Sequence, residues 1–205
     1  MTFERLPLSI KMHLKEIGEL NVVEYADYHR SGDKVYNINN KYILKISDNI
    51  VNIRNEYEKD LWLSNIDKIF IKPIEFKVRD DCAYYLREFL EGEPLCLPKY
   101  LENPDFVIDT LVEAMNYLHS IKVPLKNVCL VHGDFCLPNI VVKDNKFYGF
   151  VDLGEARIDD PWVDYAWCIW SLEYNLKTKD HTQKLLDKLG ITFDENKYKK
   201  YVPYK

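Results

Sequence analysis

The sequence predicts an α+β protein, in which β-hairpins gather towards the first half of the chain and helices towards the second. Short apolar runs flank turn-forming residues over 34–46 and again over 71–86, a pattern typical of antiparallel strands. Apolar residues at helical spacing recur after residue 103. The 205 residues, of which 47% are hydrophobic, suit one compact unit or two small lobes sharing a core.

The composition restricts the kind of partner. A net charge of −5 argues against a general nucleic-acid binder. No apolar run approaches the roughly 18 residues needed to span a bilayer, and residues 1–5 do not resemble a signal peptide. The five cysteines are odd in number and lack Cys-x-x-Cys spacing, so we expect reduced thiols rather than disulfides or a zinc site. These features predict a cytoplasmic protein without a nucleic-acid or membrane partner.

The first part of the chain reads as two hairpins, each preceded by an amphipathic helix. The two hairpins turn at Asn39–Asn40 and around Asp80–Asp81, residues that favour tight turns. In chain order, the expected elements are a helix over residues 6–20, strands over 34–38 and 42–46, a helix over 52–64, and strands over 71–78 and 82–86.

The later part of the chain reads as mostly helical. Asn103, Pro104 and Asp105 form a helix start, with Asn as the cap, Pro at the first helical position and an acid in the first turn. This helix should end at His119, which we interpret as a capping or packed histidine. Further helices are expected over residues 165–172, over 181–189 with Gly190 as the stop, and over 194–201.

The most informative stretch is His-Gly-Asp-Phe-Cys-Leu-Pro-Asn at residues 132–139. A hairpin over residues 140–151, with an Asp-Asn turn, follows it and leads to Asp-Leu-Gly. By folding the chain back, the hairpin should bring Asp152 beside Asn139 and Asp134. Carboxylate and amide oxygens are ligands that suit Mg²⁺.

A loop Asp, an Asn five residues later and an Asp-x-Gly triplet resemble the catalytic arrangement of kinases. The run from His132 to Ile140, with Gly-Phe-Val-Asp-Leu-Gly at 149–154, is similar to the aminoglycoside phosphotransferases, particularly the class that acts on a 3′-hydroxyl. The resemblance implies a two-lobed protein-kinase-like fold, with a small antiparallel sheet and one helix in the first lobe and a mostly helical second lobe. It implies a nucleotide-binding lobe over residues 1–87, a hinge over 88–92 and a catalytic lobe over 93–205.

The resemblance also implies roles for the residues around the loop. Asp134 would be the catalytic residue, which orients the acceptor hydroxyl and takes its proton. Asn139 and Asp152 would hold Mg²⁺. His132 and Asp164 would be structural supports, with Asp164 hydrogen-bonded to the backbone of the catalytic loop.

Phosphate binding is assigned to the first lobe on the same resemblance. Lys45 would bind the α- and β-phosphates, and Glu56 on the next helix would hold Lys45 in place. Glu58 is the alternative to Glu56. Ser31 maps to the loop serine near the β-phosphate.

Adenine should meet the main chain between the lobes, where Glu88 and Leu90 are the expected contacts. Some relatives carry an aromatic residue two positions before the strand lysine, which stacks on the base. This chain has Ile43 there. We therefore expect altered or weaker base binding.

Two departures from the family bear on the acceptor. The interval over residues 121–131 is far longer in the aminoglycoside 3′-kinases, where it contributes acidic contacts to the cationic sugar. From Lys177 onwards this chain has eight lysines against four acids, and a basic end would repel a polycation. Near the site, Asp160 is a candidate for a loop or substrate-side contact, and Arg157 is expected in solvent.

Together these features predict an ATP- or GTP-dependent, Mg²⁺-requiring O-phosphotransferase acting on a hydroxyl of a small molecule. An aminoglycoside is one candidate acceptor, which would make the protein an antibiotic-resistance enzyme. One alternative is a kinase for another acceptor, such as an amino alcohol, a sugar or a nucleoside. The other is a non-catalytic nucleotide-binding relative, which the intact set of Lys45, Asp134, Asn139 and Asp152 disfavours. The motifs leave open the acceptor, the preferred nucleotide and the oligomeric state.

Overall fold

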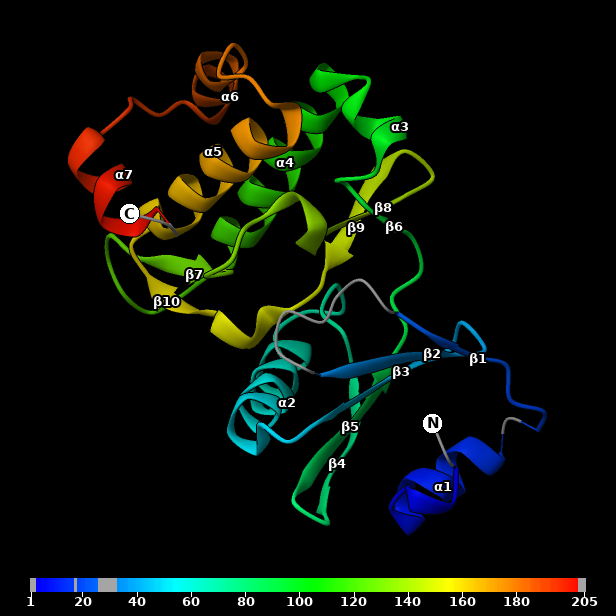
Figure 1. The fold of residues 1–205 in the computed structure, drawn as a ribbon. Coiled ribbons are helices and arrows are strands. Elements are labelled where there is room, and N and C mark those ends of the chain that lie inside the picture. Colours follow the sequence, from blue (N-terminus) through cyan, green and yellow to red (C-terminus); the bar gives the residue numbers. More distant parts are fainter. Residues whose placement is uncertain (1–2, 17, 26–32, 203–205) are drawn as a thin grey trace. The chain divides into compact units, whose positions relative to one another are not determined.

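The computed structural model describes residues 3–16, 18–25 and 33–202. Its contacts divide the chain into two units, Met1–Glu91 and Gly92–Lys205. Figure 1 shows the elements of both units, and each unit is described by itself.

The first unit is built on a five-stranded antiparallel sheet with strand order β1-β2-β3-β5-β4. Its hairpins turn at Asn39–Asn40 and Asp80–Asp81, and all four residues have positive φ, as tight hairpin turns require. The strands are β1 (Val22–Glu24), β2 (Lys34–Ile38), β3 (Tyr42–Ser47), β4 (Pro73–Arg79) and β5 (Cys82–Glu88).

A helix packs on each face of this sheet (Figure 1). On one face, α1 (Leu8–Lys15) packs Ile10 and Leu14 in a core with Leu44 and Leu86. On the other face, α2 (Ile50–Ser64) packs Ile53 against Tyr85. Because alternate residues of a strand point to opposite faces, Lys45, which follows Leu44, lies on the α2 side. A short 3₁₀ turn, η1 (Phe3–Arg5), precedes α1.

The second unit contains two small antiparallel sheets. One has the order β6-β8-β9, and the other pairs β7 with β10. The β8–β9 hairpin turns at Asp144 and Asn145, both with positive φ, so the Asp-Asn turn is confirmed. The strands are β6 (Glu93–Pro94), β7 (Cys129–Val131), β8 (Ile140–Lys143), β9 (Lys146–Phe150) and β10 (Arg157–Asp159).

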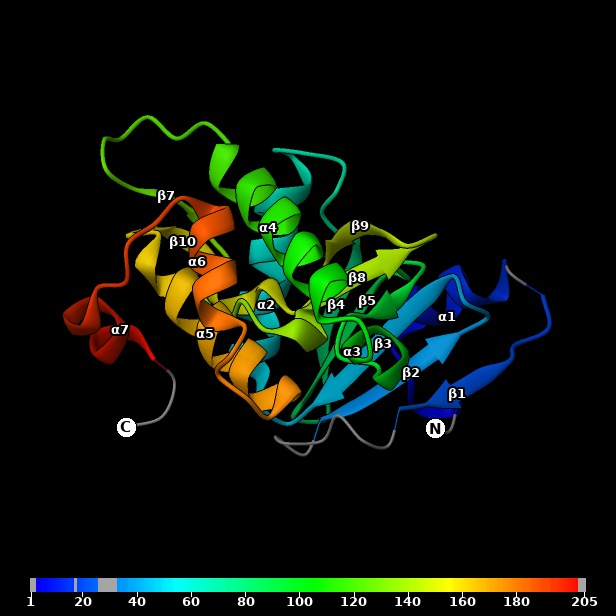
Figure 2. The same cartoon turned by 90° about the horizontal axis from the view of Figure 1, so that it is seen from above.

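Helix α4 is the central helix of the second unit, and it contacts β7, β9, α5 and α6 (Figure 2). The Asn103 side chain caps it by accepting a hydrogen bond from the backbone N–H of Phe106 at 3.2 Å, as the sequence predicted. Gly190, at φ +67°, ends α6. The helices are α3 (Pro98–Leu101), α4 (Pro104–Ser120), α5 (Trp162–Leu176), α6 (Thr182–Leu189) and α7 (Glu195–Tyr201).

The structure shifts some predicted boundaries. The first helix is shorter than residues 6–20, because it starts after Pro7 and ends at its cap, Glu16. Helix α5 starts three residues before the predicted Tyr165, directly after Pro161. The short strands β1, β6, β7 and β10 were not predicted, since two or three residues show too little alternation.

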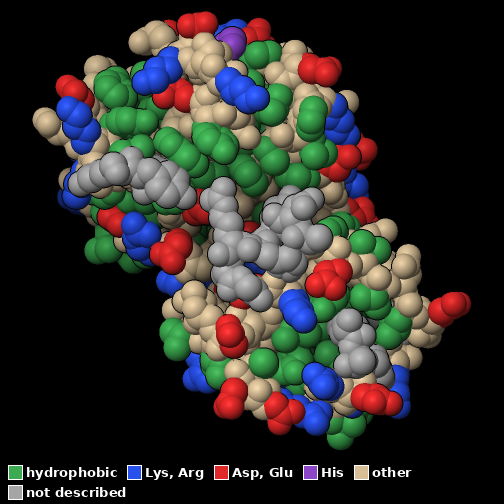
Figure 3. All heavy atoms as spheres, in the orientation of Figure 1, with side chains coloured by type: hydrophobic (Ala, Val, Ile, Leu, Met, Phe, Trp, Pro, Cys, Tyr) green, Lys and Arg blue, Asp and Glu red, His purple; other side chains and the backbone are tan. Residues whose placement is uncertain are grey.

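The surface in Figure 3 carries charged side chains of both signs, interspersed over the described residues of that face. Within the described ranges, no helix is both long and apolar enough to cross a membrane.

Candidate active site

Asp134 and Asn139 are joined directly within the second unit. The amide nitrogen of Asn139 donates hydrogen bonds to the backbone carbonyl of Asp134 at 2.9 Å and to its carboxylate Oδ2 at 3.1 Å. A 3₁₀ turn, η3 (Leu137–Asn139), makes this contact possible, and the Cys136 backbone N–H also donates to the Asp134 carbonyl, at 2.8 Å. Residues 134–139 therefore form a compact loop whose two ends are hydrogen-bonded to each other.

The other carboxylate oxygen of Asp134, Oδ1, is buried and accepts no N–H or O–H hydrogen bond from the described residues, while the thiol of Cys136 interacts with this carboxylate. A buried polar atom without a partner costs about 1–3 kcal/mol, so native proteins keep few of them. An unsatisfied carboxylate oxygen is suited to accept a hydrogen bond, and then a proton, from a substrate hydroxyl.

Asp152 follows β9 directly and begins the turn η4 (Leu153–Glu155). It adopts a left-handed conformation, at φ 58° and ψ 52°, which few residues other than Gly, Asn and Asp adopt. The backbone N–H of the preceding residue, Val151, donates to the carbonyl of Asn139 at 3.0 Å. The hairpin thus connects the start of the Asp-Leu-Gly triplet to Asn139 itself.

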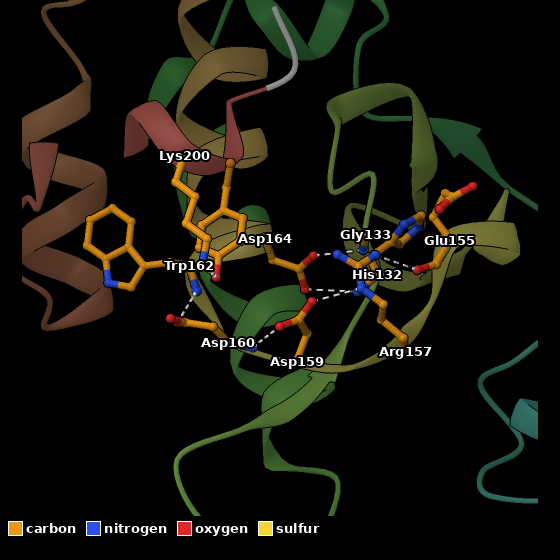
Figure 4. Close-up of polar contacts among 10 residues, drawn as sticks. His132, Gly133, Glu155, Arg157, Asp159, Asp160, Trp162, Asp164 and Lys200 are labelled. Atoms are coloured by element: carbon orange, nitrogen blue, oxygen red, sulfur yellow. Dashed lines mark hydrogen bonds and ion pairs between the residues drawn. The ribbon is translucent and has the colours of Figure 1, made fainter. Parts of the chain in front are cut away.

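Asp164, in the first turn of α5, supports the loop backbone (Figure 4). Its fully buried carboxylate accepts hydrogen bonds from the backbone N–H groups of His132 at 2.9 Å and Gly133 at 3.0 Å. The Nε2 atom of His119, from the end of α4, donates to the same carboxylate at 3.0 Å. This arrangement has the geometry expected of a structural support, and it shows that His119 is packed and hydrogen-bonded.

His132 connects the loop to the strand that leads to Asp152. Its Nε2 lies 3.0 Å from the carbonyl of Val151, and because a carbonyl only accepts, Nε2 carries the proton. Nδ1 then accepts from the backbone N–H of Asp134 at 3.4 Å. The ring is fully buried and makes edge contacts with Phe135 and Phe150, with ring centroids 6.2 and 5.9 Å away.

Gly133 is required by the close approach of another segment. It has φ +85°, and a Cβ atom there would overlap the carbonyl oxygen of Glu155 and lie 2.8 Å from the Glu155 Cβ. Only glycine therefore fits between His132 and Asp134 without a shift of the backbone.

In the first unit, Lys45 and Glu56 form an ion pair with Nζ–Oε1 at 2.6 Å. The two side chains are only 11% and 12% exposed. Glu58, the alternative partner, is exposed on α2. The structure therefore favours Glu56. Ser31 lies outside the described residues.

The end of β5 limits how the chain can bind a base. The Glu88 backbone N–H donates to the carbonyl of Lys72 at 3.1 Å, and the Phe89 backbone N–H donates to the carbonyl of Lys41 at 2.8 Å. A contact from the Glu88 backbone to a ligand would therefore use its carbonyl. Leu90 follows as a half-buried residue, and Ile43 is buried.

Three residues near the loop have ordinary structural roles. Asp160 accepts from the Trp162 backbone N–H at 3.0 Å and pairs with Lys197 at 3.0 Å, so it is a loop contact at the start of α5. Arg157 keeps a 41% exposed side chain, in line with the expectation of a solvated residue, and its Nε pairs with Asp159 at 2.8 Å on the surface. Burial raises the pKa of the Cys136 thiol far above its ordinary value, which keeps it protonated and unreactive.

No role is predicted from the sequence for Asp60, which lies one helical turn after Glu56 and is buried. Residues four apart share a helix face, so this spacing could have drawn attention to it. Its hydrogen bond from the Tyr85 hydroxyl, at 2.5 Å, joins two distant segments and could not be read from local pattern.

Asn139 and Asp152 offer an amide oxygen and a carboxylate, the kinds of oxygen ligand that suit Mg²⁺. The described residues contain no group of three His, Cys, Asp or Glu side chains able to hold a metal. Magnesium sites of this class need fewer protein ligands, because substrate phosphates and water supply the rest. The amide nitrogen of Asn139 is used by Asp134, which leaves its oxygen as the atom for a cation.

Comparisons with known proteins show what the chain is similar to. Residues 83–178 match the model of the phosphotransferase enzyme family. A probable aminoglycoside 3′-phosphotransferase of Lactococcus lactis is 40% identical over 92 residues, which are 43% of this chain and 35% of that protein. The aminoglycoside 3′-phosphotransferase of Enterococcus faecalis is 36% identical over 90 residues, 44% of this chain and 34% of that protein. The chain thus spans about a third of the length of these curated relatives.

The fold extends the likeness over nearly the whole chain. The solved aminoglycoside phosphotransferase of Streptomyces rimosus, in complex with ADP and streptomycin, superposes with a TM-score of 0.71 at 17% identity and covers 96% of each chain. The chain has the α+β, protein-kinase-like fold of the aminoglycoside phosphotransferases. The family-model match over residues 83–178 and the shared fold agree with the resemblance noted in the sequence.

Proposed function

We propose that the protein is an O-phosphotransferase that moves the γ-phosphate of ATP or GTP to a hydroxyl of a small molecule. The observation that carries this proposal is the Asp134–Asn139 contact, which leaves Asp134 Oδ1 buried and without an N–H or O–H donor among the described residues. In phosphoryl transfer a protein mainly positions groups and spreads charge. Asp134 would accept a hydrogen bond from the acceptor hydroxyl and take its proton.

The donor would bind through residues of the first unit and the start of the second. In this proposal residues 1–87 form the nucleotide-binding lobe, 88–92 the hinge and 93–205 the catalytic lobe. Lys45, held by Glu56, would contact the α- and β-phosphates, with Ser31 near the β-phosphate. The Glu88 carbonyl and the Leu90 N–H would contact the base.

Asn139 and Asp152 would hold Mg²⁺, which when bound offsets the charge of the phosphates. His132 and Asp164 would keep the loop in shape. The ADP bound to the Streptomyces relative supports a nucleotide donor for this chain. A cytoplasmic setting, where nucleotides and reduced thiols occur together, suits the five free cysteines.

The acceptor is a small hydroxylated molecule, and an aminoglycoside is the first candidate because the relatives carry that name. A second candidate is a hydroxylated acceptor without several positive charges. Two features favour it: residues 121–128 pass between α4 and β7 without a helix, and α7 carries Lys197, Lys199 and Lys200. Lys197 and Lys199 are paired with Asp160 and Glu195, so the short 121–128 segment is the stronger of the two features.

The test is nucleotide turnover with Mg²⁺ by the purified chain, with and without kanamycin. Wild type is compared with Asp134→Asn and with Asp144→Asn, an exposed turn acid, as the matched control. We expect Asp134→Asn to lose turnover by about 10²–10⁴-fold and Asp144→Asn to keep it. Stimulation by kanamycin would assign an aminoglycoside acceptor, and Asp134-dependent turnover without stimulation would assign another acceptor. Nucleotide binding without Asp134-dependent turnover, over a panel of aminoglycosides, sugars and amino alcohols, would contradict the proposal.

A further inference from the structure

Helix α7 packs on α5, whose first turn supports the loop that begins at His132. The last residue of α7, Tyr201, lies against a buried cluster that contains Val131, at the end of β7, and Val163, in α5. Val131 directly precedes His132, and Val163 directly precedes Asp164. Through this cluster, α7 is connected to both partners of the hydrogen bond between His132 and Asp164.

An ion pair joins α7 to the turn that starts α5. Lys197 Nζ lies 3.0 Å from Asp160 Oδ2, and the two side chains are 43% and 27% exposed. The other carboxylate oxygen of Asp160, Oδ1, accepts a hydrogen bond from the backbone N–H of Trp162 at 3.0 Å (Figure 4). Trp162 is the first residue of α5. The Asp160 carboxylate therefore bridges the Lys197 side chain and the first N–H group of α5.

The turn that follows Asp160 also carries the group that holds the loop. Asp164 lies one helical turn later, and its backbone N–H donates to the carbonyl of Pro161 at 3.1 Å. Its carboxylate accepts from the backbone N–H groups of His132 and Gly133 at 2.9 and 3.0 Å. Hydrogen bonds weaken steeply as their angle departs from linear. A displacement of Asp160 therefore passes to these two hydrogen bonds through a single turn of backbone.

The Lys197–Asp160 pair acts locally. An ion pair as exposed as this one contributes little to the free energy of unfolding, so it holds one turn in place rather than the whole fold. The neighbouring lysines of α7 have partners within α7. Lys199 pairs with Glu195 at 2.6 Å, and Lys200 donates to the Tyr201 hydroxyl at 2.8 Å.

We propose that Lys197 is a positioning residue for the loop that carries Asp134. By holding Asp160, it fixes the first turn of α5, and Asp164 in that turn keeps the loop backbone in place. The effect on phosphoryl transfer rests on the proposed function, but the state of the loop can be measured without nucleotide or acceptor.

The first measurement is the hydrogen-exchange rate of the backbone N–H groups of His132 and Gly133, read by NMR on the unliganded chain. Lys197→Met removes the charge and keeps most of the length of the side chain. We expect it to raise both rates about fivefold, the upper range for an ion pair of this exposure. Lys197→Arg keeps the charge and should exchange at the wild-type rate, as should Lys199→Met, the matched control on the same helix. The backbone N–H of Leu111, buried in α4, is the internal reference and should not change.

Unchanged rates at the two loop N–H groups in Lys197→Met would overturn the proposal. So would an equal increase at Leu111, because α7 would then add only to the stability of the whole fold. Asp160→Asn keeps an acceptor for the Trp162 N–H and removes the charge that Lys197 binds. Adding Lys197→Met to it should therefore raise the rates no further. Additive increases would also overturn the proposal, since Lys197 would then act through another group.

The second measurement is turnover of ATP with Mg²⁺ by the same variants, with kanamycin or with the member of the acceptor panel that stimulates wild type. We expect Lys197→Met to lower kcat about fivefold, in step with the exchange rates, and Lys197→Arg and Lys199→Met to keep it. The same kcat in Lys197→Met and wild type would contradict the effect on catalysis. If wild type turns over nucleotide with no acceptor of the panel, the proposed function fails, whereas the exchange rates still decide whether Lys197 positions the loop.

Discussion

His119 and Asp164 lie 45 residues apart in the chain, and the ring of His119 donates a hydrogen bond of 3.0 Å to the carboxylate of Asp164. The same carboxylate holds the backbone N–H groups of His132 and Gly133. One buried side chain therefore links the end of α4, the start of α5 and the loop that carries Asp134. The shape of the loop depends on a carboxylate with three donors, two from the loop itself and one from the end of α4.

Removing the His119 donor should destabilise the fold. His119→Leu leaves the Asp164 carboxylate one hydrogen bond short, and we expect the free energy of unfolding to fall by about 1–3 kcal/mol. His119→Gln retains a donor and should lose less. Urea denaturation provides the measurement, with His13→Leu as the control, because His13 is 43% exposed and makes only a 3.6 Å pair with Glu75. Equal losses in His119→Leu and His13→Leu would contradict this role.

Gly133→Ala should be far more disruptive than a matched glycine substitution. Gly133 and Gly18 have almost the same φ, +85° and +84°, so both substitutions impose the same backbone strain. A Cβ at Gly18 meets nothing within 4 Å, whereas a Cβ at Gly133 overlaps the backbone of Glu155. We expect Gly18→Ala to cost about 1–2 kcal/mol and Gly133→Ala about 3 kcal/mol or more. Thermal unfolding of the two variants, compared with wild type, gives the answer, and similar Tm losses would show that the close approach is unimportant.

Glu56 and Glu58 allow a paired test of lysine positioning. Glu56→Gln removes the charge that holds Lys45, and a hydrogen bond between charged groups contributes about 1.5–3 kcal/mol. We therefore expect the Kd for ATP with Mg²⁺ to rise at least about tenfold. Glu58 is exposed, so Glu58→Gln should bind like wild type. The Kd values are measured by calorimetry. If Glu58→Gln weakened ATP binding and Glu56→Gln did not, Glu58 would be the residue that holds Lys45.

The pH dependence of stability should report the buried Asp60. Its pKa is raised in the folded state, from an ordinary 3.8 to about 6, so the folded chain binds this proton more tightly than the unfolded chain. The stability that this proton contributes is present below about pH 4 and is lost as the pH rises through about 6. The rise in pKa corresponds to about 3 kcal/mol.

Asp60→Asn should lack this dependence. The difference in free energy of unfolding, wild type minus variant, should therefore fall by about 3 kcal/mol between pH 4 and pH 7. Urea denaturation at intervals of half a pH unit measures it. Parallel profiles for the two proteins would mean that Asp60 titrates as an ordinary exposed carboxyl.

Features set by local chemistry were predictable from the sequence. The Asn39–Asn40 and Asp144–Asn145 turns were read correctly, because these residues tolerate the positive φ that tight hairpins need. The start of α4 at Asn103 and Pro104 was also predicted correctly. A helix cap is a contact between residues close in sequence, so the local sequence determines it. The fold class followed from the resemblance carried by the motifs around Asp134 and Asp152.

Features that join distant segments were not predictable. Arg87 directly follows the predicted strand 82–86, and nothing in its neighbours shows that it is buried. The Arg157 side chain is 41% exposed, as expected, but its pairing with Asp159 belongs to the short strand β10, which forms only because β7 lies beside it. Burial and pairing of charges depend on tertiary contacts, which neither periodicity nor turn chemistry encodes.

The hairpin between Asn139 and Asp152 also determines where the chain can change its length. The backbone bond from Val151 to Asn139 closes the hairpin at its base, and the Asp144–Asn145 turn closes it at its tip. One residue added to either strand would turn every side chain beyond it to the opposite face, so Asp152 could no longer lie as it does relative to Asn139. Added residues at the exposed tip would leave the base unchanged. Length variation among functional homologues should therefore concentrate at the tip of this hairpin and spare its strands.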